Sequence, residues 1–170
     1  MALKADRHEL DVDISYFMNE TAERGLIVCI STAGSGAAMD QAGALVSIEG
    51  ATGAKIPVGV LLNDVVDLDL TRQHINWHKD EVQKGGKVAI LKKGYVVTNQ
   101  VALTGAIVPG ALAFMDDADT GYFANAAHVD DTEYTAVGRF MSGADEDGYY
   151  KVEVNLPIPI DHTVAGALNV

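Results

Sequence analysis

Short apolar runs separated by glycine or polar turns recur along most of the chain. Val, Ile and Leu dominate these runs, and such residues favour the pleated, half-buried surface of a β-sheet. The 17 glycines indicate many turns. The pattern therefore predicts a mainly β protein with closed or sandwiched β structure and an N-terminal arm. The predicted strands are at residues 26–31, 44–49, 56–62, 86–91, 95–101, 111–115, 122–126, 135–141 and 149–156.

The N-terminal segment has a pattern of its own. Leu10, Val12 and Ile14 alternate with polar residues, and Tyr16 and Phe17 then interrupt the period. We interpret the segment as an extended arm, because an alternating apolar arm can add a strand to the edge of a neighbouring sheet. Short helices at residues 15–24 or 71–82 are the alternatives. The predicted organisation is an arm at residues 1–24, a β domain at residues 25–156 and a proline-spaced tail at residues 157–170.

The strongest local prediction is a β-hairpin at residues 87–99. Two apolar stretches flank Lys92, Lys93 and Gly94, and the glycine suits the left-handed last position of a three-residue loop. A weaker signal is an internal echo, in which residues 43–46 resemble residues 110–113 and residues 58–61 resemble residues 137–140. In the second pair, a glycine within each strand would relieve a close backbone approach.

Length and charge limit the function classes. A chain of 170 residues suits one domain with a substantial core. With 12 Lys and Arg against 24 Asp and Glu, the protein has a net charge of −12, which repels phosphate backbones. No stretch of the sequence gathers a cluster of basic residues, so we expect no nucleic-acid partner. A dispersed acidic surface also keeps a protein soluble at high concentration.

Membrane and export signals are not expected either. No stretch reaches the roughly 20 apolar residues that a membrane span needs, and the N-terminal residues contain no apolar core of a signal peptide. The single cysteine, Cys29, lies in an apolar run and is interpreted as a buried, inert thiol.

The candidate metal ligands do not form a convincing site. His74 and His78 are four residues apart, and Glu81 follows them. On a helix this spacing brings two ligands together, but the alternation around Trp77 indicates a strand, on which the histidines would lie about 13 Å apart. We therefore interpret them as a polar face over a buried tryptophan.

Two acidic turns suggest calcium, but neither has the ligand pattern. Asp116, Asp117 and Asp119 precede Gly121, and residues 145–147 precede Gly148, without the bidentate glutamate of an EF-hand. We interpret both as hairpin turns stabilised by Asp side chains.

A phosphate-binding or catalytic loop is not supported at residues 34–36 either. This Gly-Ser-Gly sequence lacks the context of a P-loop or a nucleophile elbow. We therefore expect no metal, no cofactor and no enzymatic activity.

Three segments resemble the capsid decoration (cement) proteins of tailed bacteriophages. They are the strand and turn sequences at residues 57–71, 84–99 and 137–154. The resemblance covers most of the chain after Gly25. It implies a small β-barrel or β-tulip domain, usually a homotrimer, bound to the outside of a mature shell, with no catalytic residue.

The resemblance also implies partners and a location. The major capsid protein would be the partner, and the protein would be in the host cytoplasm during assembly and then on the outer capsid surface. The contact residues expected in the arm are Leu10, Val12, Ile14, Tyr16 and Phe17. The open alternatives are a head-fibre base, a tail component, and a β-barrel that binds or converts a small molecule.

Overall fold

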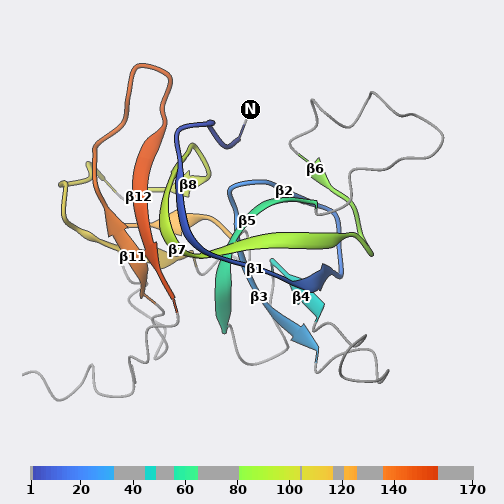
Figure 1. The fold of residues 1–170 in the computed structure, drawn as a ribbon. Helices are drawn as coiled ribbons and strands as arrows, with labels where there is room; N and C mark the ends of the chain where they lie inside the picture. Colours follow the sequence, from blue (N-terminus) through green and yellow to red (C-terminus); the bar gives the residue numbers. More distant parts are fainter. Residues whose placement is uncertain are drawn as a thin grey trace, which may run out of the picture.

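The computed structural model describes residues 2–32, 45–48, 56–64, 81–103, 105–116, 121–125 and 136–156. These residues form strands and contain no helix, so the predicted mainly β class is confirmed (Figure 1). No helix within them is long and apolar enough to cross a membrane. The strands are β1 His8–Met18, β2 Ala22–Glu23, β3 Ile27–Thr32, β4 Leu45–Ser47, β5 Pro57–Asp64, β6 Glu81–Val82, β7 Lys87–Thr98, β8 Val101–Ala102, β9 Leu112–Met115, β10 Phe123–Ala124, β11 Ala136–Phe140 and β12 Tyr150–Asn155.

The alternative of a short helix at residues 15–24 is wrong, because these residues contribute to β1 and β2. The second helical alternative, residues 71–82, lies mostly outside the described residues, and its last two residues form β6.

Five strands pair in a closed circuit. β1 pairs with β4, β4 with β3, β3 with β5, β5 with β7, and β7 again with β1. Only the β1–β4 pairing in this circuit is parallel. The second half of β7 continues the sheet through β12, β11, β9, β10 and β8, while β2 and β6 form a separate ribbon. The long strand β7 therefore belongs to both parts of the sheet (Figure 1).

The hairpin predicted at residues 87–99 is wrong, because these residues form the single strand β7 as far as Thr98. Lys93 pairs with Asn155 of β12 and with Asp11 of β1, so partners on both sides keep the chain extended. Gly94 is required for a different reason. Its φ is +141°, and a Cβ atom there would lie 1.9 Å from the carbonyl oxygen of His8. The glycine permits the close approach of β1 and does not form a turn.

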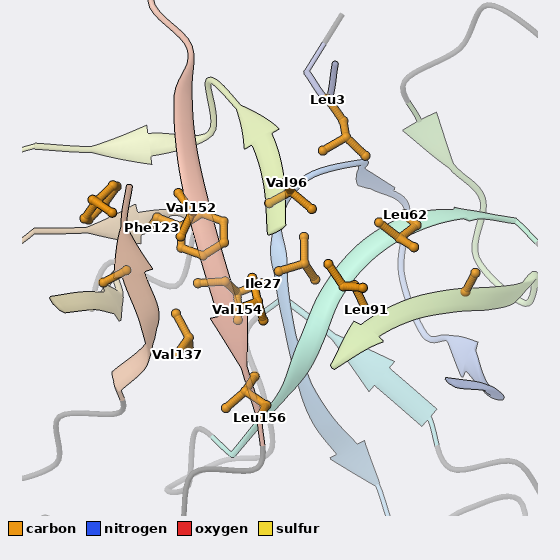
Figure 2. Close-up of a cluster of buried hydrophobic side chains, with 14 residues drawn as sticks. Leu3, Ile27, Leu62, Leu91, Val96, Phe123, Val137, Val152, Val154 and Leu156 are labelled. Atoms are coloured by element: carbon orange, nitrogen blue, oxygen red, sulfur yellow. The ribbon is translucent and has the colours of Figure 1, made fainter. Parts of the chain in front are cut away.

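Two buried clusters lie on opposite faces of β7. Val88 and Ile90 belong to the smaller cluster, and Ala89 and Leu91 belong to the larger one. This alternation is the period of a strand buried on both faces. Figure 2 shows side chains from β3, β5, β7, β11 and β12 converging in the larger cluster. Its members are Leu3, Ile27, Val60, Leu62, Ala89, Leu91, Val96, Ala113, Phe123, Val137, Phe140, Val152, Val154 and Leu156.

The glycines of the internal echo have the predicted role. A Cβ atom on Gly59 would lie 2.4 Å from the carbonyl oxygen of Leu91, and one on Gly138 would lie 1.8 Å from that of Glu153. Both glycines let a neighbouring strand pass closer than any side chain would allow.

The residues before β1 pack against the β domain. Leu3 is 4% exposed, belongs to the larger cluster and forms an isolated bridge with Thr98. The carbonyl oxygen of Ala2 accepts a hydrogen bond of 2.9 Å from the Thr98 hydroxyl. Lys4 Nζ lies 2.6 Å from Asp145 Oδ2. The first residues of the chain thus complete the core (Figure 2).

Candidate functional site

The predicted contact residues lie on β1, but they do not share one face. Leu10 is 70% exposed and Ile14 is 49% exposed. Val12 packs against the larger cluster and Tyr16 against the smaller one. Phe17 is half-buried where β1 meets β4. The structure therefore brings Leu10 and Ile14 to the surface of β1 and uses the other three residues to hold the strand.

A register shift explains the exposure of Leu10. Glu9 and Asp11 pair with Gly94 and Lys93, which are neighbours in β7, so Leu10 is an extra residue between them. An extra residue of this kind forms a β-bulge, which turns a side chain away from its regular direction. Simple alternation would have placed Leu10 on the same face as the packed Val12.

A second shift lies at Ile14. From Asp13 to Tyr16 the strand β1 advances three residues, while its partner β7 advances two, from Ile90 to Val88. Ile14 and Ser15 lie within this shift, and both are exposed. The two large aliphatic side chains on the surface of β1 thus coincide with the two places where β1 carries an extra residue.

The two edges of β1 differ in how many partners they have among the described strands. The strand pairs with β7 from His8 to Phe17. On its other edge, the described partners are those of Phe17 and Met18 in β4. Within the described residues, no strand pairs with that edge over residues 8–16. We call this stretch the outer edge of β1. An unpaired edge presents backbone donors and acceptors that another strand can use.

The acidic residues of β1 have different environments. Asp13 Oδ2 lies 2.5 Å from Lys92 Nζ, and both side chains are about a quarter exposed. Its carboxylate also accepts hydrogen bonds from the backbone amide and the hydroxyl of Ser15. Partial burial opposes ionisation of Asp13, but the hydrogen bonds from Lys92 and Ser15 outweigh it, so the pKa of Asp13 is lowered. Asp13 is therefore an ionised, internally satisfied group.

Lys92 shows the matching effect. Burial alone would lower the pKa of Lys92, but the hydrogen bond to Asp13 and the nearby Tyr16 and Asp11 raise it above its ordinary value. Of the remaining acids, Glu9 pairs with Arg7 at 2.5 Å and Asp11 is exposed. Of the two acids that flank Leu10, Asp11 is thus the one whose charge no ion pair within the described residues offsets.

A second exposed apolar patch was not found from the sequence. Val108 is 70% exposed, Leu112 46% and Met141 48%. Leu112 lies in β9 and pairs in register with Arg139, Met141 directly follows β11, and the amide of Gly110, two residues after Val108, donates to the carbonyl of Phe140, so the backbone positions of the three residues are neighbours. Apolar residues within a strand are usually interpreted as core, which concealed this patch.

The candidate metal sites gain no support in the described part of the chain. No group of three His, Cys, Asp or Glu side chains there could hold a metal ion. His74 and His78 lie outside the described residues, and Glu81 is exposed in β6. Asp145 is a turn residue as predicted, because its Oδ1 accepts hydrogen bonds from the amides of Asp147 and Tyr149.

The other turn and the remaining candidates add little chemistry. Asp117 and Asp119 of the second acidic turn lie outside the described residues, as do residues 34–36. Cys29 is 0% exposed, as predicted for a buried thiol, and its Sγ lies 3.3 Å from the sulfur of Met115.

Comparison with known protein families identifies the class of the chain. Residues 5–156 match the family described as XM1 gp53 minor capsid protein. The chain belongs to this family. The match begins before β1 and ends after β12, so it covers every described strand. The protein is therefore a phage capsid protein with a structural role in the virion. No curated protein matches the chain.

Proposed function

We propose that the protein is a decoration, or cement, protein that binds the outer surface of the phage capsid and stabilises the shell. The observation that carries this proposal is the family match over the whole β domain, together with large aliphatic side chains exposed on β1. An outer position in the virion fits the charge of the protein. A net charge of −12 would be repelled by packaged DNA on the inside.

The major capsid protein is the proposed partner. Leu10 and Ile14 supply the apolar contact, while Val12, Tyr16 and Phe17 anchor β1 to the rest of the domain. Each copy needs only modest affinity, because a shell offers many identical sites. The proposed role needs no metal, cofactor or catalytic residue.

Self-association as a homotrimer is part of the proposal. A trimer needs apolar area between subunits, and the exposed residues Val108, Leu112 and Met141 offer such area beside β9 and β11. Light scattering coupled to size exclusion should give three times the mass of 18.0 kDa. If the protein is a monomer at high concentration, both free and bound to shells, the trimer proposal is wrong and the proposed capsid role still stands.

The capsid role is tested with shells that lack the protein. Purified full-length protein is mixed with such shells, and bound copies are counted after sedimentation. We expect saturable binding and a higher melting temperature of the shells. Cryo-electron microscopy of the decorated particles should show added density on the outside. Shells that remain bare contradict the proposal, and density on the tail or at a fibre base assigns the protein to another part of the virion.

A further inference from the structure

The outer edge of β1 combines a backbone that no described strand pairs with, two exposed aliphatic side chains and the exposed carboxylate of Asp11. We infer that this edge docks an extended, basic segment of the shell protein, which adds a strand beside β1. The inference rests on the proposed function, and it specifies the type of contact and the chemistry of the partner.

The bulges are the first argument. Without them Leu10 and Ile14 would follow the alternation of Val12 and face the domain, but the register shifts turn them outward. Bulges are built features that redirect individual side chains. Covering exposed Leu and Ile side chains with a partner removes apolar surface from water and so favours binding. Spaced four residues apart on one strand, they can contact alternate side chains of an added strand.

Charge is the second argument. Asp11 follows Leu10 on the exposed part of β1, whereas Glu9 pairs with Arg7 and Asp13 pairs with Lys92. An incoming strand with Lys or Arg opposite Asp11 would form a favourable cross-strand pair. An uncharged strand would form no such pair, and an acidic strand would be repelled. A basic segment with aliphatic residues between its charges is therefore the partner that fits.

The same features disfavour a second copy of this chain on this edge. Two β1 strands paired around Asp11 would bring the Asp11 carboxylates of both copies close together, and like charges across strands destabilise the pair. Charged residues and bulges are also the usual means by which an edge strand avoids pairing with itself. The edge therefore favours a basic strand over its own copy.

The aliphatic contact is tested with a matched pair of variants in the full-length protein. Leu10→Ser/Ile14→Ser removes the proposed contact, and Ile56→Ser is the control, because Ile56 is 57% exposed and directly precedes β5. The probe is the purified shell lacking this protein. We expect Leu10→Ser/Ile14→Ser to weaken binding by a factor of about 10 or more, while Ile56→Ser binds as the unchanged protein does.

The charge and the strand pairing are tested separately. Asp11→Lys should weaken binding several-fold, and the loss should shrink as salt screens the charges, whereas Glu146→Lys in the exposed turn before β12 should have little effect. Hydrogen–deuterium exchange of the bound protein should show slower exchange of the amides in residues 8–16. Melting temperatures of the free variants establish that each one is folded.

The outcomes separate this inference from the proposed function. If the unchanged protein leaves shells bare, both are wrong. If it binds but Leu10→Ser/Ile14→Ser binds equally well, or if the amides of β1 exchange at an unchanged rate, the docking site is wrong and the capsid role stands. If the double variant instead changes the mass of the free protein in light scattering, the occupant is a second copy and the inference is wrong.

Discussion

Lys92 and Asp13 meet between β7 and β1, with Nζ and Oδ2 2.5 Å apart, at a place where the register of the two strands shifts. Lys92 is an extra residue of β7 between the partners of Asp11 and Val12. Asp13 also accepts hydrogen bonds from Ser15, which lies in the following shift of β1. This ion pair thus links the irregular positions on both strands, including the bulge that exposes Ile14.

Asp13→Asn should therefore lower the free energy of unfolding at neutral pH. The change removes the charge that Lys92 pairs with, and a half-buried pair of this kind contributes roughly 1 kcal/mol. Urea unfolding followed by fluorescence measures the difference. Asp11→Asn, at an exposed neighbouring position, is the control and should change stability much less. Equal stability of Asp13→Asn and the unchanged protein would show that the pair contributes nothing.

The contribution of Asp13 should also disappear in acid. Because the folded-state pKa of Asp13 is lowered, the unfolded chain takes up the proton first as the pH falls. The stabilisation is complete above the ordinary pKa of 3.8 and is lost as the pH falls through the lowered folded value. The difference in stability between the unchanged protein and Asp13→Asn should shrink below about pH 4. A difference that stays constant into strong acid would contradict the pairing.

The sequence predicted the positions of most strands because short apolar runs bounded by glycine are strong local signals. β3, β5, β9 and β12 lie within a residue or two of their predicted positions. The hairpin predicted in place of β7 was wrong because Lys92, Lys93 and Gly94 have the local composition of a turn. Pairing with β1 and β12 keeps these residues extended, and such pairing depends on residues far away in the chain.

Only part of the candidate site could be predicted from the sequence, because its geometry also depends on pairing between distant strands. The alternation of Leu10, Val12 and Ile14 correctly indicated an extended segment, but it also indicated that the three share a face. The bulges that separate them are set by the register against β7, which no local pattern reveals. The patch around Met141 depends in the same way on the pairing of β9 with β11.

Gly94→Ala should destabilise the protein far more than Gly105→Ala. Both glycines have positive φ, +141° and +131°, but a Cβ atom on Gly94 meets the His8 carbonyl, whereas Gly105 has open space around it. Backbone strain alone costs about 1 kcal/mol, and the clash should bring the loss at Gly94 above about 3 kcal/mol. Chemical denaturation measures both. Similar losses would show that β1 does not press on Gly94.

Leu3→Ala should cost about 2–4 kcal/mol, because it empties a site in the larger cluster. Leu112→Ala, at a residue that is 46% exposed, is the control and should cost much less. The same measurement bears on any variant that lacks the residues before β1 and is tested for capsid binding. If Leu3→Ala is strongly destabilising, such a variant would lose part of its core, so weaker binding would not by itself identify a capsid contact. A negligible effect of Leu3→Ala would place the first residues outside the folded domain.

Cys29 should report on the opening of the closed circuit of strands. It lies in β3 between β4 and β5, pairs in register with Ser47 and Pro57, and is 0% exposed. A thiol without solvent access reacts only when the surrounding strands separate, so a thiol reagent should modify native Cys29 slowly and the denatured chain rapidly. Thr21→Cys on a Cys29→Ala background provides an exposed thiol for comparison and should react at once in the native protein. Adding Gly94→Ala to the unchanged cysteine should accelerate labelling, because a less stable fold opens more often. Labelling of native Cys29 as fast as that of Thr21→Cys would mean that β3 is not enclosed by its neighbours.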